Sequence, residues 1–428
     1  MKLLWLCNIM LPRIARALSM PYRSTNGWLT GLSEELLGQE GVEFSVSFPV
    51  PSQAGPLEGE TEGLAYYGFP WSGRDYSYQA GTEEYFVSLL ERIRPEVIHI
   101  FGTEFPHTLA MIRACERTGM ISRAVISIQG LVSVYAQHYF ADLPKRVVNS
   151  STLRDFLKHD NIRQARKSYE KRGQQEQEAL QRVPCVIGRT DWDRACAEQI
   201  HPGVKYYFCN ETLRSSFYEH RWSLGACERH SIFVSQWGYP IKGFHKLLEA
   251  LPLLIRQFPD VRVYTTGDSP LGRMDWKERL KQNSYQKYVK ELIRNNHLEE
   301  HVIFLGGELD EDRMREAFLR SHVFLSPSSI ENSPNSLGEA MLLGVPCVSS
   351  DVGGVKDMLV HGREGFLYPF DEQYMIAYYI GRIFEEDELA LGFSKAGREH
   401  ARKTHDPGRN LRDLMGVYEA IRGSIAGL

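Results

Sequence analysis

Short apolar runs alternate with segments of helical periodicity along most of this 428-residue chain. The clearest runs lie at residues 3–7, 97–101, 125–128, 184–188 and 231–235, and each leads into a turn. Runs this short and this apolar are typical of strands buried on both faces of a parallel sheet, with helices between them. The alternation therefore predicts an α/β fold that binds its ligands at the carboxyl ends of the strands.

A chain of this length exceeds what one core supports, and it predicts two or three domains. The alternation loosens around residues 209–228 and restarts at 231, so we place a boundary between residues 225 and 226. The expected parts are a domain at 1–225, a domain at 226–404 and a final helical segment at 405–428.

Composition argues against several classes of protein. The net charge of −4 gives no reason to expect a nucleic-acid partner. Seven scattered cysteines include no C-x-x-C pair, which argues against zinc and fits reduced thiols in the cytoplasm. No apolar stretch reaches the roughly 18–20 residues that span a bilayer. Residues 3–11 resemble a signal-peptide core, but Pro12 and Arg13 interrupt it, and the run suits a first buried strand.

Two segments have alternative interpretations. Residues 49–80 have turn composition and many aromatic side chains, so they predict a loop that packs on itself or stacks on sugar rings. Residues 143–172 carry many lysines and arginines, which would suit the surface of an anionic membrane. Asp155, Asp160 and Glu170 interrupt this basic run, which favours an ordinary solvated helix.

Residues 326–351, SPSSIENSPNSLGEAMLLGVPCVSSD, predict a loop, a helix and a strand. Turn-type residues at 334–336 precede a short apolar helix at 337–343, and Gly344 can end that helix in the left-handed conformation. A buried strand at 345–349 follows. The loop leaves unpaired helix N–H groups and positive dipole charge at the mouth of a sheet, where anions bind.

Two carboxylates flank this helix start. Glu331 lies in the loop and Glu339 lies about one turn into the helix, so the two can face one ligand from two sides. A carboxylate only accepts hydrogen bonds, which suits the vicinal hydroxyls of a ribose or hexose. The alternative is that Glu339 stabilises the helix dipole and that Glu331 is solvated.

The spacing of these residues resembles the donor site of family 4 glycosyltransferases. The shared pattern is Glu331, seven residues, Glu339-Ala340-Met341, then Gly344-Val345-Pro346 and Asp351-Val352-Gly353-Gly354. The resemblance implies the GT-B fold, two Rossmann-like domains facing across a cleft. It makes 1–225 the acceptor-side domain and 226–404 the nucleotide-sugar donor domain, with 405–428 returning to the first domain as a helix. It also implies retaining transfer that needs no metal or other cofactor.

The same resemblance assigns roles to individual residues. Lys242, which precedes Gly243, matches the lysine that holds the donor diphosphate, and it forms the expected catalytic set with Glu331. Glu339 would hold the ribose. The other donor-binding candidates are Asn335, Ser336, Leu337, Gly27 and Gln129.

Three positions depart from the family pattern. Trp237 stands where an arginine is usual, which leaves the second diphosphate cation unidentified, with Arg189 and Arg273 as guesses. Gln129 stands where a histidine usually faces the donor sugar. Residues 332–334 replace Gly-Phe-Gly, and the proline among them has no N–H. These departures bear on the identity of the sugar more than on the fold.

Asp191 and Asp193 have the spacing of a pair that could hold a divalent metal on a nucleotide diphosphate. Thr190 before them is a helix N-cap type, so capping and the helix dipole account for both aspartates without a metal. The same explanation applies to residues 310–312.

The expected function is therefore transfer of a sugar from a nucleotide-diphosphate sugar to a hydroxyl of a saccharide or lipid-linked acceptor. Polysaccharide or glycolipid assembly is the expected setting, in the cytoplasm or peripherally at the inner face of the membrane. Two alternatives stay open: a nucleotide-sugar epimerase or hydrolase of the same fold, and a non-catalytic scaffold that binds nucleotide sugars.

Overall fold

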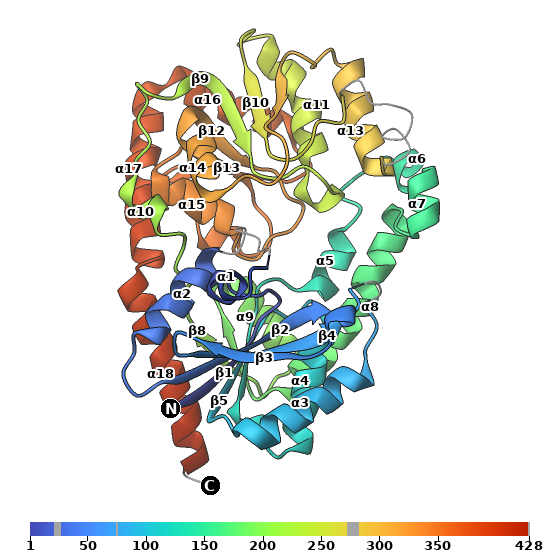
Figure 1. Ribbon diagram of the computed structural model, residues 1–428. Helices are drawn as coiled ribbons and strands as arrows, with labels where there is room; N and C mark the ends of the chain where they lie inside the picture. The colour runs from blue at the N-terminus through green and yellow to red at the C-terminus, as the bar shows by residue number, and fades with distance from the viewer. Residues whose placement is uncertain (21–26, 74–75, 272–281, 427–428) are drawn as a thin grey trace. The chain divides into compact units, whose positions relative to one another are not determined.

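The computed structural model describes residues 1–20, 27–73, 76–271 and 282–426 (Figure 1). It divides into two compact units. Unit 1 comprises Met1–Val134, Ser168–Leu213 and His405–Leu428, and unit 2 comprises Tyr135–Lys167 and Arg214–Thr404. Each unit has its own mainly parallel sheet with helices between the strands, so the predicted α/β fold class is confirmed.

Unit 1 is built on an eight-stranded sheet whose strands are β1 (Lys2–Leu6), β2 (Glu43–Pro51), β3 (Leu57–Thr61), β4 (Leu64–Trp71), β5 (Val97–Phe101), β6 (Ala124–Ser127), β7 (Cys185–Gly188) and β8 (Lys205–Phe208). Their order is β3-β4-β2-β1-β5-β6-β7-β8. Neighbouring strands pair in parallel except β3 and β4. The chain moves outward from β1 on one side and from β5 on the other, so the topological switch point lies between β1 and β5.

The helices of unit 1 are α1 (Pro12–Ala17), α2 (Gly27–Leu37), α3 (Ala80–Ile93), α4 (Pro106–Arg117), α9 (Asp191–Ile200) and α18 (Pro407–Ala426). Two helices, α5 (Val132–His138) and α8 (Ile162–Arg182), run from one unit into the other. The last helix, α18, belongs to the core of unit 1, because the Trp5 indole N–H donates a 3.0 Å hydrogen bond to the buried Tyr418 hydroxyl.

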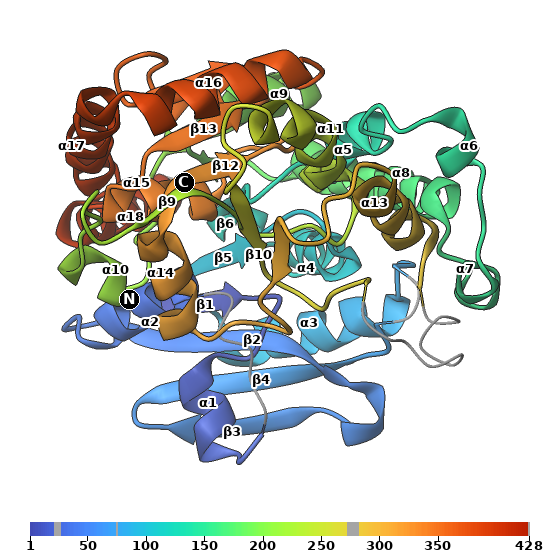
Figure 2. The same ribbon diagram turned by 90° about the horizontal axis from the view of Figure 1, so that it is seen from above.

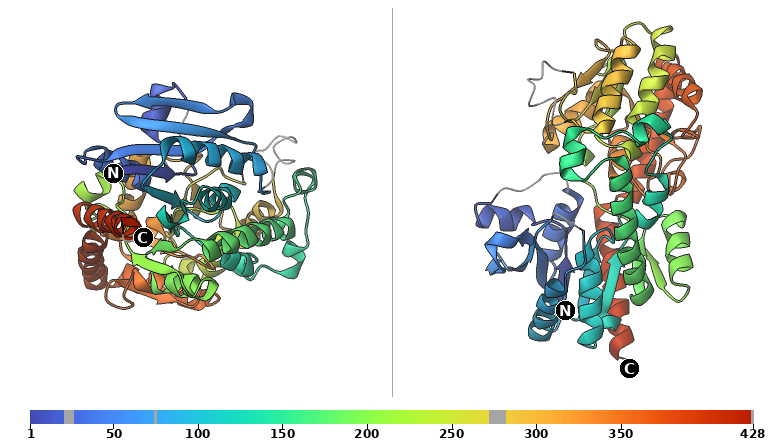
Figure 3. Two further views of the ribbon diagram at one scale, coloured as in Figure 1. Left: turned by 90° about the horizontal axis from the view of Figure 1, so that it is seen from below. Right: turned by 90° about the vertical axis from the view of Figure 1, so that its right-hand side faces the viewer.

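Much of the stretch at 49–80, which is predicted to be a loop, forms strands, although residues 72–73 and 76–79 belong to no helix or strand. β2 runs on to Pro51, and β3 and β4 form an antiparallel hairpin that extends the sheet beyond β2 (Figures 2 and 3). Tyr66 and Phe69 on β4 are buried, so neither ring is exposed for stacking on a sugar. Gly59, a residue type that suggests a turn, stands opposite Tyr66, and a Cβ there would lie 2.2 Å from the Tyr66 hydroxyl. A side chain at Gly59 would therefore displace the Tyr66 ring.

Unit 2 is built on a six-stranded parallel sheet whose strands are β9 (Glu228–Val234), β10 (Arg262–Thr265), β11 (Val302–Phe304), β12 (Ser321–Ser326), β13 (Cys347–Ser350) and β14 (Gly365–Tyr368). Their order is β11-β10-β9-β12-β13-β14. Its helices are α6 (Lys145–Val148), α7 (Leu153–Lys158), α10 (Ser216–Glu219), α11 (Phe244–Ile255), α13 (Ser284–Asn295), α14 (Glu311–Arg320), α15 (Asn335–Leu343), α16 (Gln373–Glu385) and α17 (Asp387–Thr404). Here the switch point lies between β9 and β12.

The division into units differs from the expected domains at 1–225 and 226–404. Residues 135–167 group with unit 2, because the His245 ring on α11 bonds the Ala141 carbonyl at 2.8 Å and Arg146 pairs with Glu291 on α13 at 2.8 Å. Residues 214–225 also belong to unit 2, where the Trp222 indole N–H donates to the Ser321 carbonyl at 2.8 Å. These contacts link residues 99 to 145 positions apart, which no local pattern reveals.

None of the described helices combines the length and the hydropathy that a bilayer-spanning helix needs.

Candidate active site

Residues 326–351 of unit 2 form the predicted loop, helix and strand, although the helix begins at Asn335 and not at residue 337. β12 leads into a loop at 327–334, α15 follows, and Gly344 ends that helix with a φ of 81° before β13 begins. Pro334 is the residue before the helix and gives it no side-chain cap. The helix therefore presents its first backbone N–H groups at the carboxyl edge of the sheet.

Lys242 and Glu331, the two predicted catalytic residues, form an ion pair. The Lys242 Nζ lies 2.5 Å from Glu331 Oε1, which also accepts a 2.7 Å hydrogen bond from the Ser328 hydroxyl. Lys242 follows β9 and Glu331 follows β12, so the pair lies at the switch point of the sheet, where open α/β sheets bind ligands. The Lys242 side chain is 22% exposed, so the protein does not enclose it completely.

Two glycines allow the loops around this pair to approach one another. Gly243 has a φ of 65°, and a Cβ there would lie 1.7 Å from the Pro327 carbonyl oxygen. Gly353 has a φ of 53°, and a Cβ there would lie 2.0 Å from the Glu331 carbonyl oxygen. The Ser329 N–H also donates to the Ile241 carbonyl at 2.7 Å. Any side chain at either glycine would push the two loops apart, so the Lys242–Glu331 geometry depends on both.

Glu339 is held by a partner that the sequence did not indicate. Both oxygens of its carboxylate accept from the Arg214 guanidinium, at 2.6 and 2.7 Å, and both side chains are buried. Burial raises the pKa of Glu339, and the Arg214 charge opposes that rise. Arg214 lies in the stretch where the sequence pattern loosens, and it is 125 residues from Glu339, so no local signal marks it. Two lone-pair positions of the carboxylate stay open for other donors.

The backbone N–H groups at the start of α15 are not equivalent. Leu337 is one of the three residues at this helix start that are predicted to bind the nucleotide sugar. Its N–H donates a 3.0 Å hydrogen bond to the Pro334 carbonyl, so that amide is already engaged. The Ser336 N–H has no acceptor within the part of the chain that the structure describes. Asn335 and Ser336 thus stay the predicted anion-binding positions.

The second diphosphate cation is not found among the guessed residues. Arg189 lies in unit 1, where it is buried and pairs with Glu211 at 2.5 Å, so its charge is already neutralised. Arg273 lies outside the described residues. Trp237, which replaces the family's arginine, is buried against Phe304 in unit 2.

Two donor-binding candidates, Gly27 and Gln129, belong to unit 1. The Gln129 side-chain amide donates to Glu211 at 2.6 Å, so it belongs to the same buried network as Arg189. Gly27 is the first residue of α2, and Asn26 before it lies outside the described residues. Their contact with a donor stays a prediction.

The switch point of unit 1 holds a carboxyl group that the sequence analysis did not single out. Glu104 follows β5, and its Oε1 accepts a 3.1 Å hydrogen bond from the Asn8 side chain, which follows β1. Glu104 Oε2 has no partner among the described residues. Burial, reinforced by the charge of Glu176, raises the pKa of Glu104 to about 7.

Glu104 should make the stability of the protein depend on pH. Because folding raises the pKa of Glu104 from 4.5 to about 7, the folded protein keeps this proton at pH values where the unfolded chain has lost it. The stability linked to the proton is fully present below pH 4.5 and is lost as pH rises through about 7. By linkage the free energy of unfolding should fall by about 3 kcal/mol between pH 4.5 and pH 7, and Glu104→Gln should remove this fall. Urea unfolding at pH 4.5 and pH 7 measures the difference, with exposed Glu40→Gln as the control for the charge change. Equal pH dependence in wild type and Glu104→Gln would contradict the assignment.

The predicted helix caps are confirmed. Thr190 is the N-cap of α9, its hydroxyl accepts from the Asp193 N–H at 3.0 Å, and the Asp193 carboxylate accepts from the Thr190 N–H. Asp310 caps α14 by accepting from the Arg313 N–H at 2.8 Å. Capping thus gives Asp193 and Asp310 a structural role.

Most of unit 2 matches the model of one known protein family. Residues 221–400 match the family model described as glycosyl transferases group 1. The match includes Lys242, Glu331 and Glu339.

Curated relatives are glycosyltransferases of several kinds. The phosphatidyl-myo-inositol mannosyltransferase of Mycolicibacterium smegmatis is 29% identical over 197 residues, which is 46% of each chain. The N-acetyl-alpha-D-glucosaminyl L-malate synthase of Bacillus anthracis is 31% identical over 111 residues, 26% of this chain and 28% of that protein. The chain thus spans about half the length, or less, of the curated relatives it matches.

Solved structures resemble the whole chain. A sucrose-phosphate synthase from Thermosynechococcus elongatus covers 99% of both chains with a TM-score of 0.72 at 15% identity. HepE of Anabaena, in complex with UDP, covers 100% of both with a TM-score of 0.64 at 16% identity. At this identity the likeness establishes the fold alone, which is the GT-B fold of these glycosyltransferases. The chain therefore has the GT-B fold, and residues 221–400 match the model of the glycosyl transferases group 1 family.

Proposed function

We propose that this protein is a retaining glycosyltransferase that moves a sugar from a nucleotide-diphosphate sugar to a hydroxyl acceptor in polysaccharide or glycolipid assembly. The observation that carries the proposal is the Lys242–Glu331 pair at the switch point of the unit that matches the family. The Lys242 ammonium suits the negative charge that develops on the diphosphate, and the Glu331 carboxylate suits the positive charge that develops on the sugar.

The leaving group of this reaction is a diphosphate whose negative charge grows as the bond breaks. Lys242 would turn from Glu331 to that charge, and the N-terminus of α15 would add the Ser336 N–H and its dipole. Glu331, released from the ammonium, would orient the hexose and favour its oxocarbenium-like character. Glu339 would accept from the ribose hydroxyls through the lone pairs that Arg214 leaves open. In family 4 enzymes, retention of the anomeric configuration is explained by attack of the acceptor hydroxyl on the face of the sugar from which the diphosphate leaves. We propose the same course here.

UDP sugars are the first donors to test, because the HepE structures contain UDP and UDP-glucose. The mannosyltransferase relatives are named for a phosphatidyl-inositol acceptor, which supports a lipid-linked or saccharide acceptor here. Such a reaction would take place in the cytoplasm at the inner face of the membrane. Seven free cysteines, five of them buried, support a reducing compartment.

Transfer and its stereochemistry can be tested together. A thermal-shift screen of UDP, GDP, ADP and CDP sugars would identify the donor, since a ligand at 100 times its Kd stabilises by about 2.7 kcal/mol. NMR of the product should then show a new glycoside with the donor's anomeric configuration. Excess EDTA should leave the rate within about twofold, because we propose that cations and helix dipoles replace a metal.

Three other outcomes would each refute part of the proposal. An epimerised or hydrolysed donor without a glycoside product would indicate the epimerase or hydrolase alternative. Donor binding without turnover would indicate a scaffold. Activity that EDTA abolishes and manganese restores would show that the reaction needs a metal.

A further inference from the structure

Helix α7 of unit 2 buries a charged side chain and exposes its apolar ones, which is the reverse of an ordinary surface helix. Its only buried residue is Asp155. Its three large apolar side chains face solvent instead, with Leu153 53% exposed, Phe156 67% exposed and Leu157 69% exposed. A surface helix normally buries its apolar side and exposes its charges, so this arrangement needs a reason outside the folding of unit 2.

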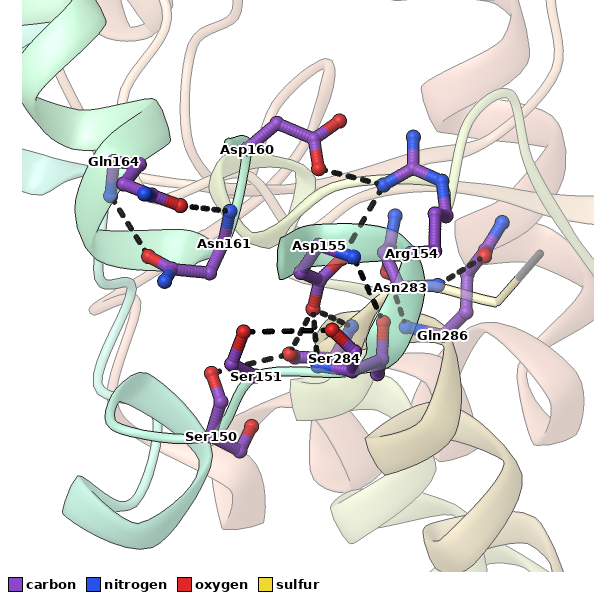
Figure 4. A network of polar contacts seen from close by, with 11 residues as sticks. Ser150, Ser151, Arg154, Asp155, Asp160, Asn161, Gln164, Asn283, Ser284 and Gln286 are labelled. Atoms are coloured by element: carbon purple, nitrogen blue, oxygen red, sulfur yellow. Dashed lines mark hydrogen bonds and ion pairs between the residues drawn. The ribbon is translucent and has the colours of Figure 1, made fainter. Parts of the chain in front are cut away.

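Hydrogen bonds to buried Asp155 fix the orientation of α7 (Figure 4). One Asp155 oxygen accepts from the Ser284 N–H at 3.0 Å and from the Ser284 hydroxyl, both at the start of α13. The same carboxylate accepts from the Thr152 N–H at 3.1 Å in a capping box. If α7 rotated to bury its leucines, Asp155 would turn away from Ser284, and the Ser284 N–H and hydroxyl would lose their acceptor. The network therefore keeps Phe156 and Leu157 pointing outward.

The chain around α7 is basic, although the whole protein carries a net charge of −4. Residues 135–167 contain seven Lys or Arg and three Asp. All three aspartates are already paired, Asp142 with Lys246 and the other two with Arg154. Four exposed basic residues form no ion pair with any described residue: Lys145, Lys158, Arg163 and Lys167.

We propose that α7 is a docking element for an anionic membrane surface. Leu153, Phe156 and Leu157 would enter the boundary between headgroups and acyl chains, and the unpaired basic residues would contact lipid phosphates. The docking proposal rests on the proposed function in one respect, which is that a lipid-linked acceptor lies in a membrane. It also answers the question that the sequence left open for residues 143–172, because the acidic residues among them that belong to unit 2 are taken up by internal pairs.

A lipid surface fits α7 better than a protein partner. Stable protein interfaces bury about 800 Å² on each partner and are depleted in lysine, whereas α7 offers three apolar side chains among unpaired basic residues. Apolar side chains combined with flexible cations are what interfacial helices present to anionic lipids. α6 and α7 also lie at an outer edge of their unit (Figures 1 and 2).

Vesicle flotation of the full chain, without any donor, tests the proposal. The protein should float with vesicles of phosphatidylcholine and phosphatidylglycerol, and much less with phosphatidylcholine alone. Phe156→Ser/Leu157→Ser should reduce binding at least about tenfold, and Lys158→Glu about fivefold. Salt at about 1 M, where the Debye length is about 3 Å, should weaken binding of the wild type.

The matched control is Tyr374→Ser/Tyr378→Ser on α16, which removes two rings exposed at 67% and 57%. It should bind vesicles like the wild type. The proposal is overturned if the wild type does not bind anionic vesicles, or if the α7 variant binds as well as the control. It is also overturned if the α7 variant loses only a dimer seen by light scattering, which would make α7 a protein interface. Donor thermal shifts, measured separately, should be equal in all variants, so failure here leaves the transferase proposal standing.

Discussion

Replacing Lys242 with alanine should lower kcat by about 10²–10³-fold and raise the donor KM by less. The ammonium would meet charge that develops only as the sugar–phosphate bond breaks, so its loss weakens binding of the transition state more than binding of the donor. No second diphosphate cation was found among the described candidates, because Arg189 is already paired with Glu211. Initial rates over a range of donor concentrations measure both quantities.

Stability must be measured alongside these rates. Lys242→Ala leaves the mostly buried Glu331 carboxylate without its cation, so unfolding free energy should fall by about 1–3 kcal/mol. That is more than the change of less than about 0.5 kcal/mol expected for a plain surface lysine. Lys246→Ala is the matched control. The Lys246 side chain is 10% exposed, against 22% for Lys242, and it pairs with Asp142 at 3.5 Å. It should lose stability and keep kcat.

Arginine at position 242 should restore only part of the rate, because its planar fork is not a point charge. A folded Lys242→Ala enzyme with wild-type kcat would remove this residue from the reaction. Equal loss of kcat in Lys242→Ala and Lys246→Ala would show that the effect comes from a disturbed fold.

Replacing Glu339 with glutamine should weaken donor binding by about 1.5–3 kcal/mol, through loss of charge-assisted bonds to the ribose. Calorimetric titration with the donor nucleotide measures this change. From the sequence alone we expect the fold to stay intact, but the structure changes that part of the expectation. The substitution leaves the buried Arg214 guanidinium unpaired, so we expect unfolding free energy to fall by about 3–5 kcal/mol as well.

A double variant separates binding from folding at this pair. Arg214→Met/Glu339→Gln removes both charges and should recover most of the lost stability, because replacing a whole buried ion pair is often neutral. Donor affinity should stay weak in the double variant, since the carboxylate is still absent. Recovery of affinity together with stability would mean that Glu339 only holds the fold. An unchanged Kd in Glu339→Gln would exclude it from the donor site.

The local chemistry of residues 326–351 could be read directly from the sequence. The apolar run of α15, the glycine that ends it and the strand after it are local signals, and all three elements form as predicted. The same holds for β5, whose observed bounds are those of its apolar run. Such signals work because propensity and periodicity depend on neighbouring residues only.

Local signals failed where packing between distant segments decides the structure. Residues 57–71 have the composition of a loop, yet they include β3 and β4, because β2 offers an edge with which β4 pairs. The sequence pattern places residues 135–167 in the first domain, yet they pack with unit 2 through contacts such as His245 to Ala141.

The sequence by itself determined the α/β class, the family resemblance and the identity of Lys242, Glu331 and Glu339 as the residues to examine. Only the tertiary structure decided what these side chains touch. Lys242 meets Glu331 across 89 residues, and Glu339 meets Arg214 across 125. The physical reason is that an ion pair forms where two strand ends or helices are brought together, and that position depends on the whole sheet. The outward face of α7 has the same origin, since Ser284, 129 residues away, holds Asp155 inward.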